Sequence, residues 1–124
     1  MTSNMALLQK KAKEANLDIQ FVSFSVDPER DTPKELKHYA KQYGADTANW
    51  NFLTGYDFMT MKEISIKTFQ SMMAMLEKDK DGDYQVTHST RFYLVNPEGK
   101  VIKNYKGIQV DEMDKILEDL KKVQ

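Results

Sequence analysis

Two side chains of this sequence occupy positions where ligand chemistry is often found in proteins that alternate strands and helices. His88 stands just before the apolar segment 90–95, and Asp27 directly follows the apolar segment 19–26. The chain contains no cysteine. It therefore lacks a thiolate for nucleophilic attack, disulfide exchange or soft-metal binding. Any chemistry of this chain depends on imidazole, carboxylate, amide and thioether groups.

Each of the two histidines has a simple structural interpretation. The residues alone favour His88 as a loop histidine that is hydrogen-bonded to the backbone. The alternative is a metal ligand, because a neutral imidazole is a common ligand of metal ions. His38 lies between Lys37 and Tyr39 in a predicted helix, and we interpret it as a solvated or packed side chain.

Asp27 lies at the carboxyl end of a predicted strand, where α/β sheets place ligand sites. It could tune a metal site or contact a partner. The alternative, which the residues favour, is an aspartate that forms a turn by accepting hydrogen bonds from nearby amides. No residue is predicted to be catalytic.

Two other patterns resemble metal sites but have simpler interpretations. Soft sulfur is abundant between residues 59 and 75, but helical spacing beside apolar neighbours favours packing against the core or a partner. The methionines concerned are Met59, Met61, Met72, Met73 and Met75. The run Asp79-Lys80-Asp81-Gly82-Asp83 is similar to a calcium loop, but its glycine comes two places early and position twelve is Thr90. We interpret the run as an exposed turn.

Length and composition exclude several classes of protein. The 124 residues allow one domain, covering residues 1–124, with an ordinary soluble composition of 40% hydrophobic and 30% charged residues. A net charge of −1 argues against nucleic-acid binding. No apolar run approaches the ~20 residues that span a bilayer, and no targeting segment is visible.

The elements that must position these residues alternate along the chain, which predicts an α/β fold with a mixed sheet. Predicted helices cover 3–16, 33–43, 57–66 and 111–123; predicted strands cover 19–26, 50–55, 90–95 and 100–105. Residues 68–76 are predicted to be helical or irregular, and 77–83 to form a charged turn.

Local signals support several of these elements. Segment 19–26 is apolar at both odd and even positions, which predicts a strand buried on both faces. Thr32 and Glu35 have the spacing of a capping box. In the first helix the predicted inward stripe contains Met5, Leu8, Ala12 and Ala15, and leaves Gln9 outside it.

Taken together, four segments resemble the Sco/SenC family. They are the strand and Asp-Pro-x-x-Asp-Thr-Pro turn at 22–33, Phe-Leu-Thr-Gly at 52–55, the His-Ser-Thr step at 88–90, and the hairpin at 92–100. The resemblance implies a thioredoxin-like fold and copper bound by a Cys-x-x-x-Cys motif with one distal histidine. His88 matches that histidine.

The resemblance also implies what this sequence does not contain. Its first residues are similar to those just after the cysteine motif, so the N-terminal part and a central strand are expected to be missing. That strand would lie between segments 19–26 and 90–95. Each main-chain group left unpaired and dry costs about 1–3 kcal/mol, against the ~5–15 kcal/mol that stabilises a domain. We therefore expect strand exchange, a dimer or a longer parent protein instead of a stable monomer.

The function implied by the resemblance is that of a copper chaperone, which is not an enzyme, for assembly of the dicopper centre of cytochrome c oxidase. The chain as written would be inactive, binding copper weakly or not at all. The partner would be the oxidase subunit that carries the dicopper site, and the parent would be extracytoplasmic and membrane-anchored.

Two alternatives remain open. The intact protein could be a thiol-disulfide oxidoreductase or a peroxidase-like enzyme, or the chain could be a non-catalytic interaction domain. Thioredoxins place a cis-proline before the antiparallel strand, whereas residues 86–90 contain no proline. This favours a metal histidine over a redox loop.

Overall fold

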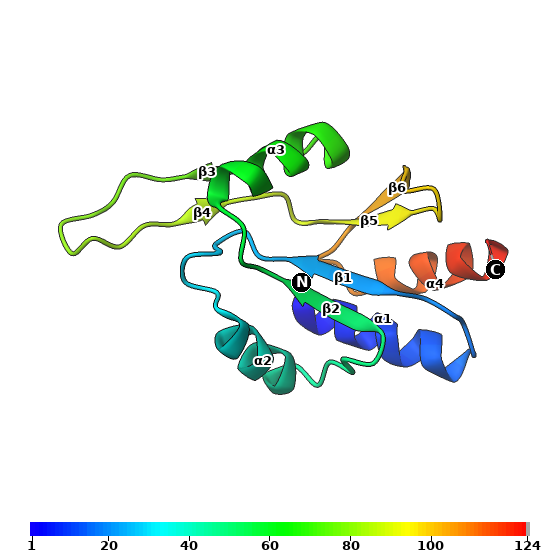
Figure 1. Cartoon of the computed structure of the whole chain (residues 1–124). Helices are drawn as coiled ribbons and strands as arrows, with labels where there is room; N and C mark the ends of the chain where they lie inside the picture. The colour runs from blue at the N-terminus through cyan, green and yellow to red at the C-terminus, as the bar shows by residue number, and fades with distance from the viewer. Residues whose placement is uncertain (124) are drawn as a thin grey trace.

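Residues 1–123, which the computed structural model describes, form four α-helices and six β-strands. In chain order they are α1 (Thr2–Glu14), β1 (Phe21–Phe24), α2 (Pro33–Gln42), β2 (Trp50–Leu53), α3 (Phe58–Phe69), β3 (Ala74–Met75), β4 (Val86–Thr87), β5 (Arg91–Val95), β6 (Val101–Lys106) and α4 (Glu112–Lys122). Figure 1 shows their arrangement. The α/β class predicted from the sequence is confirmed.

The strands form three separate pairs instead of one continuous sheet. β1 pairs in parallel with β2, while β3–β4 and β5–β6 are antiparallel. No ladder joins β1 to β5 among the described residues. The parallel and antiparallel pairs expected of a mixed sheet are thus both present. The interval between β1 and β5 is where a central strand was expected to be missing.

One edge of β1 has no strand partner within residues 1–123. The amides of Phe21 and Ser25 donate to the carbonyls of Asn49 (2.8 Å) and Leu53 (2.9 Å) beside β2. Because main-chain groups alternate between the two edges of a strand, those of Val22 and of Phe24 point away from β2. This edge faces the interval between β1 and β5.

β5 presents a second such edge. The Gly107 amide donates to the Thr90 carbonyl at 2.8 Å, and Phe92 lies opposite Tyr105 in the ladder. Antiparallel pairs alternate between hydrogen-bonded and non-hydrogen-bonded positions, so the main-chain groups of Tyr93 point away from β6. In Figure 1, β1 and β5 run in opposite directions.

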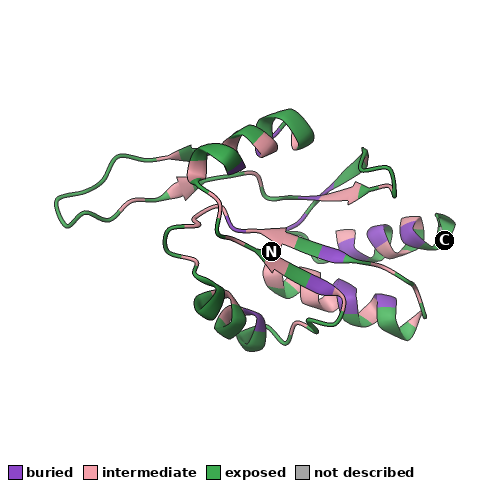
Figure 2. Cartoon of the chain, in the orientation of Figure 1, coloured by how far each residue is buried: buried purple, intermediate pink, exposed green. Residues whose placement is uncertain are grey.

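A single core supports both pairs of strands from one side. α1 and α4 lie together beneath β1–β2 and β5–β6, and their inward faces are buried (Figures 1 and 2). The buried residues of this core are Leu8, Ala12, Phe21, Trp50, Phe92, Tyr105, Met113, Ile116 and Leu120. The shared helical layer, not a shared ladder, holds the two pairs together.

The interval is bridged by one aromatic side chain. Phe69, the last residue of α3, has its ring centroid 6.3 Å from that of Phe24 on β1 and 4.7 Å from that of Tyr93 on β5. Phe24 alternates with the core residue Phe21 along β1, so it points to the opposite face. Phe69 therefore spans the interval on the face opposite α1 and α4.

The predicted capping residue begins α2, whereas α1 has no side-chain cap. The Thr32 hydroxyl accepts a hydrogen bond from the Glu35 amide at 3.3 Å, and Pro33 is the first residue of α2. Gly44 follows α2 with a φ of +69°, which costs glycine little. These local signals set the direction in which α2 leaves the loop after β1.

Three details differ from the sequence-based expectations. Val22 is 44% exposed, so β1 is not buried on both faces, because the neighbouring strand position is open. Gln9 is 5% exposed instead of lying outside the buried stripe. Part of segment 68–76 is a strand: α3 ends at Phe69, and β3 follows. Pairing with β4 outweighs the helical pattern there.

Candidate metal-binding histidine

His88 occupies the short connection between β4 and β5 and is exposed. It lines a pocket of about 480 Å³ between the end of α3 and the β5–β6 pair. Tyr93, whose main chain lies on the open edge of β5, and Phe69, which bridges the interval, line the same pocket. The structure thus places the predicted metal ligand beside the interval where a strand was expected to be missing.

A hydrogen bond determines which ring nitrogen of His88 is available. Nδ1 lies 2.7 Å from the carbonyl oxygen of Ser89. A carbonyl oxygen only accepts, so Nδ1 must carry the hydrogen in this contact. In the neutral ring the lone pair is then on Nε2, as in many metal sites where a backbone carbonyl orients a ligating histidine. The backbone-bonded loop histidine and the metal ligand are therefore compatible interpretations.

His88 does not form a complete metal site within this chain. No group of three histidine, cysteine, aspartate or glutamate side chains comes together within residues 1–123. One imidazole nitrogen cannot satisfy copper, which takes two or more donors and prefers thiolates in its cuprous state. The donor set of this chain alone does not fit a copper site.

Asp27 lies in the turn after β1, with both carboxylate oxygens engaged. Oδ2 accepts a hydrogen bond from Nε of Arg30, and Oδ1 accepts one from the Tyr84 hydroxyl at 2.8 Å. Its own amide donates to the Ser25 hydroxyl at 3.0 Å. The side chain does form a local turn contact, as expected, but through a guanidinium instead of amides, and it also contacts a residue 57 positions away.

Arg30 and Tyr84 complete this network, which the sequence analysis did not detect. The guanidinium of Arg30 lies 4.1 Å from the Tyr84 ring centroid, and its Nη2 donates to the Tyr84 carbonyl at 2.8 Å. A cation over an aromatic face is attracted by the negative face of the ring. No local pattern could indicate this contact, because the two residues are 54 positions apart.

The network shifts the titration of both groups. The hydrogen bond to Asp27, followed by desolvation, raises the pKa of the Tyr84 phenol. The hydrogen bond to the same carboxylate raises the pKa of the Arg30 guanidinium. Both shifts stabilise the phenol as a donor and the guanidinium as a cation, so the network persists across neutral pH.

The two predicted site residues are not in direct contact. Within residues 1–123 no hydrogen bond joins Asp27 to His88. They are connected through Tyr84, which contacts Asp27 directly. Three residues, two of them in β4, separate Tyr84 from His88. Asp27 is therefore placed to act on His88 only through the chain that carries it.

The other candidate groups have structural roles. Met61 and Met73 are buried, whereas Met59 and Met72 are 66% and 74% exposed. His38 is exposed on α2. The 77–83 segment is an exposed turn, as predicted. It is closed by its own hydrogen bonds, including those from two amides to the Asp79 carboxylate.

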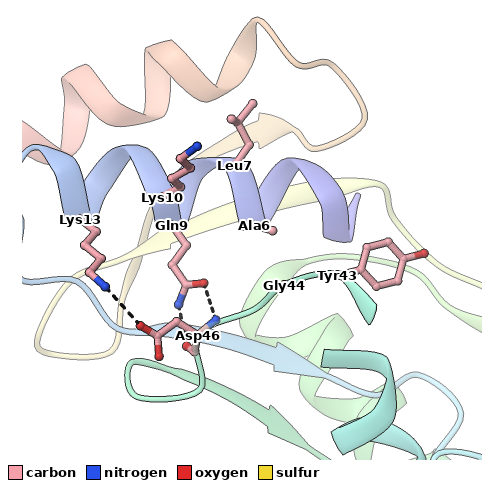
Figure 3. Close-up of a pocket in the computed structure, with 8 residues that line it drawn as sticks. All are labelled: Ala6, Leu7, Gln9, Lys10, Lys13, Tyr43, Gly44 and Asp46. Carbon is pink, nitrogen blue, oxygen red and sulfur yellow. Dashed lines mark hydrogen bonds and ion pairs between the residues drawn. The ribbon is translucent and has the colours of Figure 1, made fainter. Parts of the chain in front are cut away.

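A second pocket, of about 380 Å³, lies between α1 and the loop after α2. Gln9 and Lys13 point from α1 toward Asp46 (Figure 3). The Gln9 amide accepts from the Asp46 amide at 2.9 Å and donates to the Asp46 carbonyl at 2.7 Å. These contacts satisfy the buried Gln9 and attach the loop to α1, so the pocket is structural.

No helix of residues 1–123 has the length and apolar character needed to cross a bilayer.

The sequence and the fold of this chain are similar to those of known proteins. A family model described as SCO1/SenC matches residues 1–124. The SCO1 protein homolog of Bacillus subtilis (strain 168) is 45% identical over 121 residues, which cover 98% of this chain and 61% of that protein. The chain thus spans less than two thirds of this relative's length.

Solved structures share the fold. A SCO1/SenC family lipoprotein from Bacillus anthracis str. Ames is 47% identical, with a TM-score of 0.86 over 98% of this chain and 69% of the other. BsSco, described as a member of the Sco family of cytochrome c oxidase assembly proteins with a disulfide switch, is 45% identical with a TM-score of 0.83 over 98% and 68% of the two chains.

A more distant structure is that of Arabidopsis thaliana ScoI with copper bound. It is 27% identical and has a TM-score of 0.75 over 98% of this chain and 73% of the other. The match of the family model along the whole sequence, together with the identity to the Bacillus subtilis relative, places the chain in the SCO1/SenC family.

Proposed function

We propose that this chain forms part of a copper-binding chaperone domain for assembly of the dicopper centre of cytochrome c oxidase, with His88 as one copper ligand. The named relatives support this: one similar structure contains copper, and another belongs to a family of oxidase assembly proteins. Copper is here the cargo, to be bound and passed on.

The observation that carries the proposal is the state of the His88 ring. Its Nδ1 is committed to the Ser89 carbonyl, which leaves Nε2 as the metal-binding nitrogen on an exposed side chain. The ring lines a pocket and does not pack in the core. A soft copper ion could therefore approach Nε2 without unfolding the chain.

The remaining donors must come from outside these residues, since the chain has no cysteine. We infer that they are two thiolates on a strand between β1 and β5. The outward-pointing main-chain groups of Val22, Phe24 and Tyr93 support this position, because an inserted strand would satisfy them. His88 lies in the connection just before β5 and is therefore close to the position of the inserted strand.

The proposal concerns a binding protein, not an enzyme. As written, the single domain of residues 1–124 is inactive in copper transfer, because one imidazole cannot hold the ion. The thiol-dependent enzyme considered as an alternative is not favoured by the comparisons, whose names describe SCO1 and oxidase assembly. No observation within residues 1–123 specifically favours the interaction-domain alternative.

Location and partner are part of the same proposal. A similar protein is a lipoprotein, which supports a parent anchored to a membrane and acting outside the cytoplasm. The partner is then the oxidase subunit that holds the dicopper site. A second copy of the chain that exchanges a strand is the other partner consistent with the open edges of β1 and β5.

The experiment is a copper titration of the chain extended by a strand that carries Cys-x-x-x-Cys. Cu(I) affinity is measured by competition with a chromogenic chelator. We expect His88→Ala to weaken Cu(I) binding by at least about tenfold, or ~1.4 kcal/mol. His38→Ala, which removes the other exposed histidine, is the matched control and should leave the affinity unchanged.

Equal affinities of the His88→Ala and unchanged proteins would refute the role of His88. If the extended chain binds no copper at all while remaining folded by circular dichroism, the copper proposal itself fails.

A further inference from the structure

We propose that Asp27, Arg30 and Tyr84 form a clamp whose role is to position His88. This inference rests on the proposed function, because positioning matters only if His88 binds metal. It assigns a role to Asp27 that needs no contact with the metal. The three residues contact one another at the base of a long projecting arm.

The arm consists of β3, β4 and the loop between them, residues 74–87 (Figure 1). Its own ladder is short: Ala74 pairs with Thr87 and Met75 with Val86, and the Leu76 amide adds one bond to the Gln85 carbonyl at 2.7 Å. Beyond these contacts the loop is exposed. Such a ladder cannot by itself fix where the arm lies on the molecule.

The clamp attaches the returning half of the arm by three different groups of Tyr84. Its hydroxyl donates to Asp27 at 2.8 Å, its ring lies under the Arg30 guanidinium at 4.1 Å, and its carbonyl accepts from Arg30 at 2.8 Å. Arg30 also binds the Asp27 carboxylate. Each residue of the clamp therefore contacts the other two.

Asp27 and Arg30, the clamp residues outside the arm, lie on a hydrogen-bonded turn after β1. The amides of Arg30 and Asp31 donate to the Asp27 carbonyl at 3.2 and 2.9 Å, and the Ser25 hydroxyl donates to the Asp31 carboxylate at 2.6 Å. Ser25 directly follows β1 and is buried. The turn therefore fixes Asp27 and Arg30 relative to β1, and these two residues in turn fix Tyr84.

The consequence for His88 is that its segment is tethered at both ends. Tyr84 is held by the clamp, and Arg91 begins β5, which is paired with β6 along its length. Only residues 85–90 lie between these anchors, and two of them form β4. Without the clamp, the segment free to move would extend through the arm to the buried Met73, and ordering it for metal binding would cost more entropy.

The test uses the chain extended by a strand that carries Cys-x-x-x-Cys, because one imidazole alone cannot hold the ion, with CuSO4 as the metal probe. Tyr84→Leu removes the hydroxyl and the ring, whereas Tyr84→Phe removes only the hydroxyl, with its bonds to Asp27 and, at 3.5 Å, to Glu29. Tyr43→Leu, which changes another partly exposed tyrosine outside the arm, is the matched control. Amide hydrogen exchange and the Cu(II) dissociation constant are measured for each variant.

We expect Tyr84→Leu to speed amide exchange of residues 85–90 by about tenfold, or ~1.4 kcal/mol of local opening, and to leave α4 unchanged. Cu(II) binding should weaken by about threefold, with Tyr84→Phe intermediate. In a His88→Ala background, Tyr84→Leu should have no further effect on Cu(II) affinity, because positioning acts through the imidazole.

Several outcomes would overturn the inference. One is unchanged exchange of 85–90 in Tyr84→Leu; another is a loss of Cu(II) affinity that persists in the His88→Ala background, which would indicate a merely structural role. Failure of the proposed function looks different: His88→Ala alone would leave Cu(II) affinity unchanged, and the positioning role would fall with it. If His88→Ala weakens binding but Tyr84→Leu does not, only the clamp fails.

Discussion

At the scale of single residues, the hydrogen bond between His88 and Ser89 has more consequence than its exposed setting suggests. A free imidazole divides its proton between two nitrogens, whereas the Ser89 carbonyl selects Nδ1. The nitrogen left for the metal, Nε2, is at the far end of the ring. Under the proposed function, a metal bound at Nε2 would lie as far from the backbone as the side chain allows.

Gly107 is a second residue with a specific steric role. A Cβ atom at this position would lie 2.9 Å from two carbons of the Phe92 ring and 2.9 Å from the Thr90 carbonyl oxygen. The same carbonyl accepts the Gly107 amide. The end of β6 can therefore approach β5 this closely only without a side chain.

We predict that Gly107→Ala lowers the free energy of unfolding by about 1–3 kcal/mol, because the Phe92 ring in the core must move. Urea denaturation followed by circular dichroism measures this change. Ile108→Ala, at the neighbouring exposed position, should change the free energy by no more than about 0.5 kcal/mol. Equal stabilities of the Gly107→Ala and Ile108→Ala proteins would contradict the steric explanation.

At the scale of elements, those with strong local signals could be predicted from the sequence. The capping residues around Pro33 placed α2, and the Asn96–Gly99 turn placed the β5–β6 hairpin, because these interactions involve residues a few positions apart. The amphipathic pattern of α4 depends only on its own residues. The family likeness then indicated His88 as a metal ligand, which stays a prediction.

What could not be predicted depends on distant residues. Gln9 is buried because Asp46 and Asn49 satisfy its amide from a loop 37 and 40 positions away. β3 exists because β4 pairs with two of its residues. The contact between Arg30 and Tyr84 has no local pattern either. Each of these features depends on tertiary proximity, which periodicity and capping do not report.

The attachment of α4 to β6 gives a prediction for acid conditions. The Asp119 carboxylate accepts hydrogen bonds from Lys103 Nζ at 2.7 Å and from the Tyr105 hydroxyl at 2.8 Å. These contacts, Lys103 first, lower the pKa of Asp119. Its stabilising contribution is therefore complete above the unfolded-state pKa of about 3.9 and is lost as the pH falls through the lower folded-state pKa.

We predict that the melting temperature falls less steeply below about pH 4 in Asp119→Asn than in the unchanged chain, because the substitution removes one titrating contact. Thermal melts between neutral and acid pH measure the difference. Near neutral pH the variant should be the less stable of the two. Parallel profiles over the whole range would show that the Asp119 contacts do not contribute to acid sensitivity.

At the scale of the whole molecule, two pairs of strands share one helical layer without sharing a ladder. The paired edges of β1 and β5 are protected by β2 and β6, while their other edges are open. An open strand edge is a template for pairing with another segment. The two open edges could therefore pair with one more strand.

Amide hydrogen exchange along β1 and β5 tests this arrangement. Because main-chain groups alternate between edges, we predict that the amides of Val22, Phe24 and Tyr93 exchange faster than those of Phe21 and Phe92 in the same strands. Uniform protection along β1 would contradict an open edge in the single chain. Measurements at several protein concentrations then show whether a second copy covers the edge, because that protection falls on dilution.

The Phe69 ring has a final consequence. It rests on both sides of the interval and belongs to the last turn of the helix that leads into the arm. Side-chain packing can slide without breaking a main-chain hydrogen bond, so the spacing of the two halves is adjustable. Arrival of an extra segment would push on this aromatic wedge and, through it, on the base of the arm. Because Phe69 and His88 line the same pocket, a segment that displaced the Phe69 ring would change the surroundings of the imidazole.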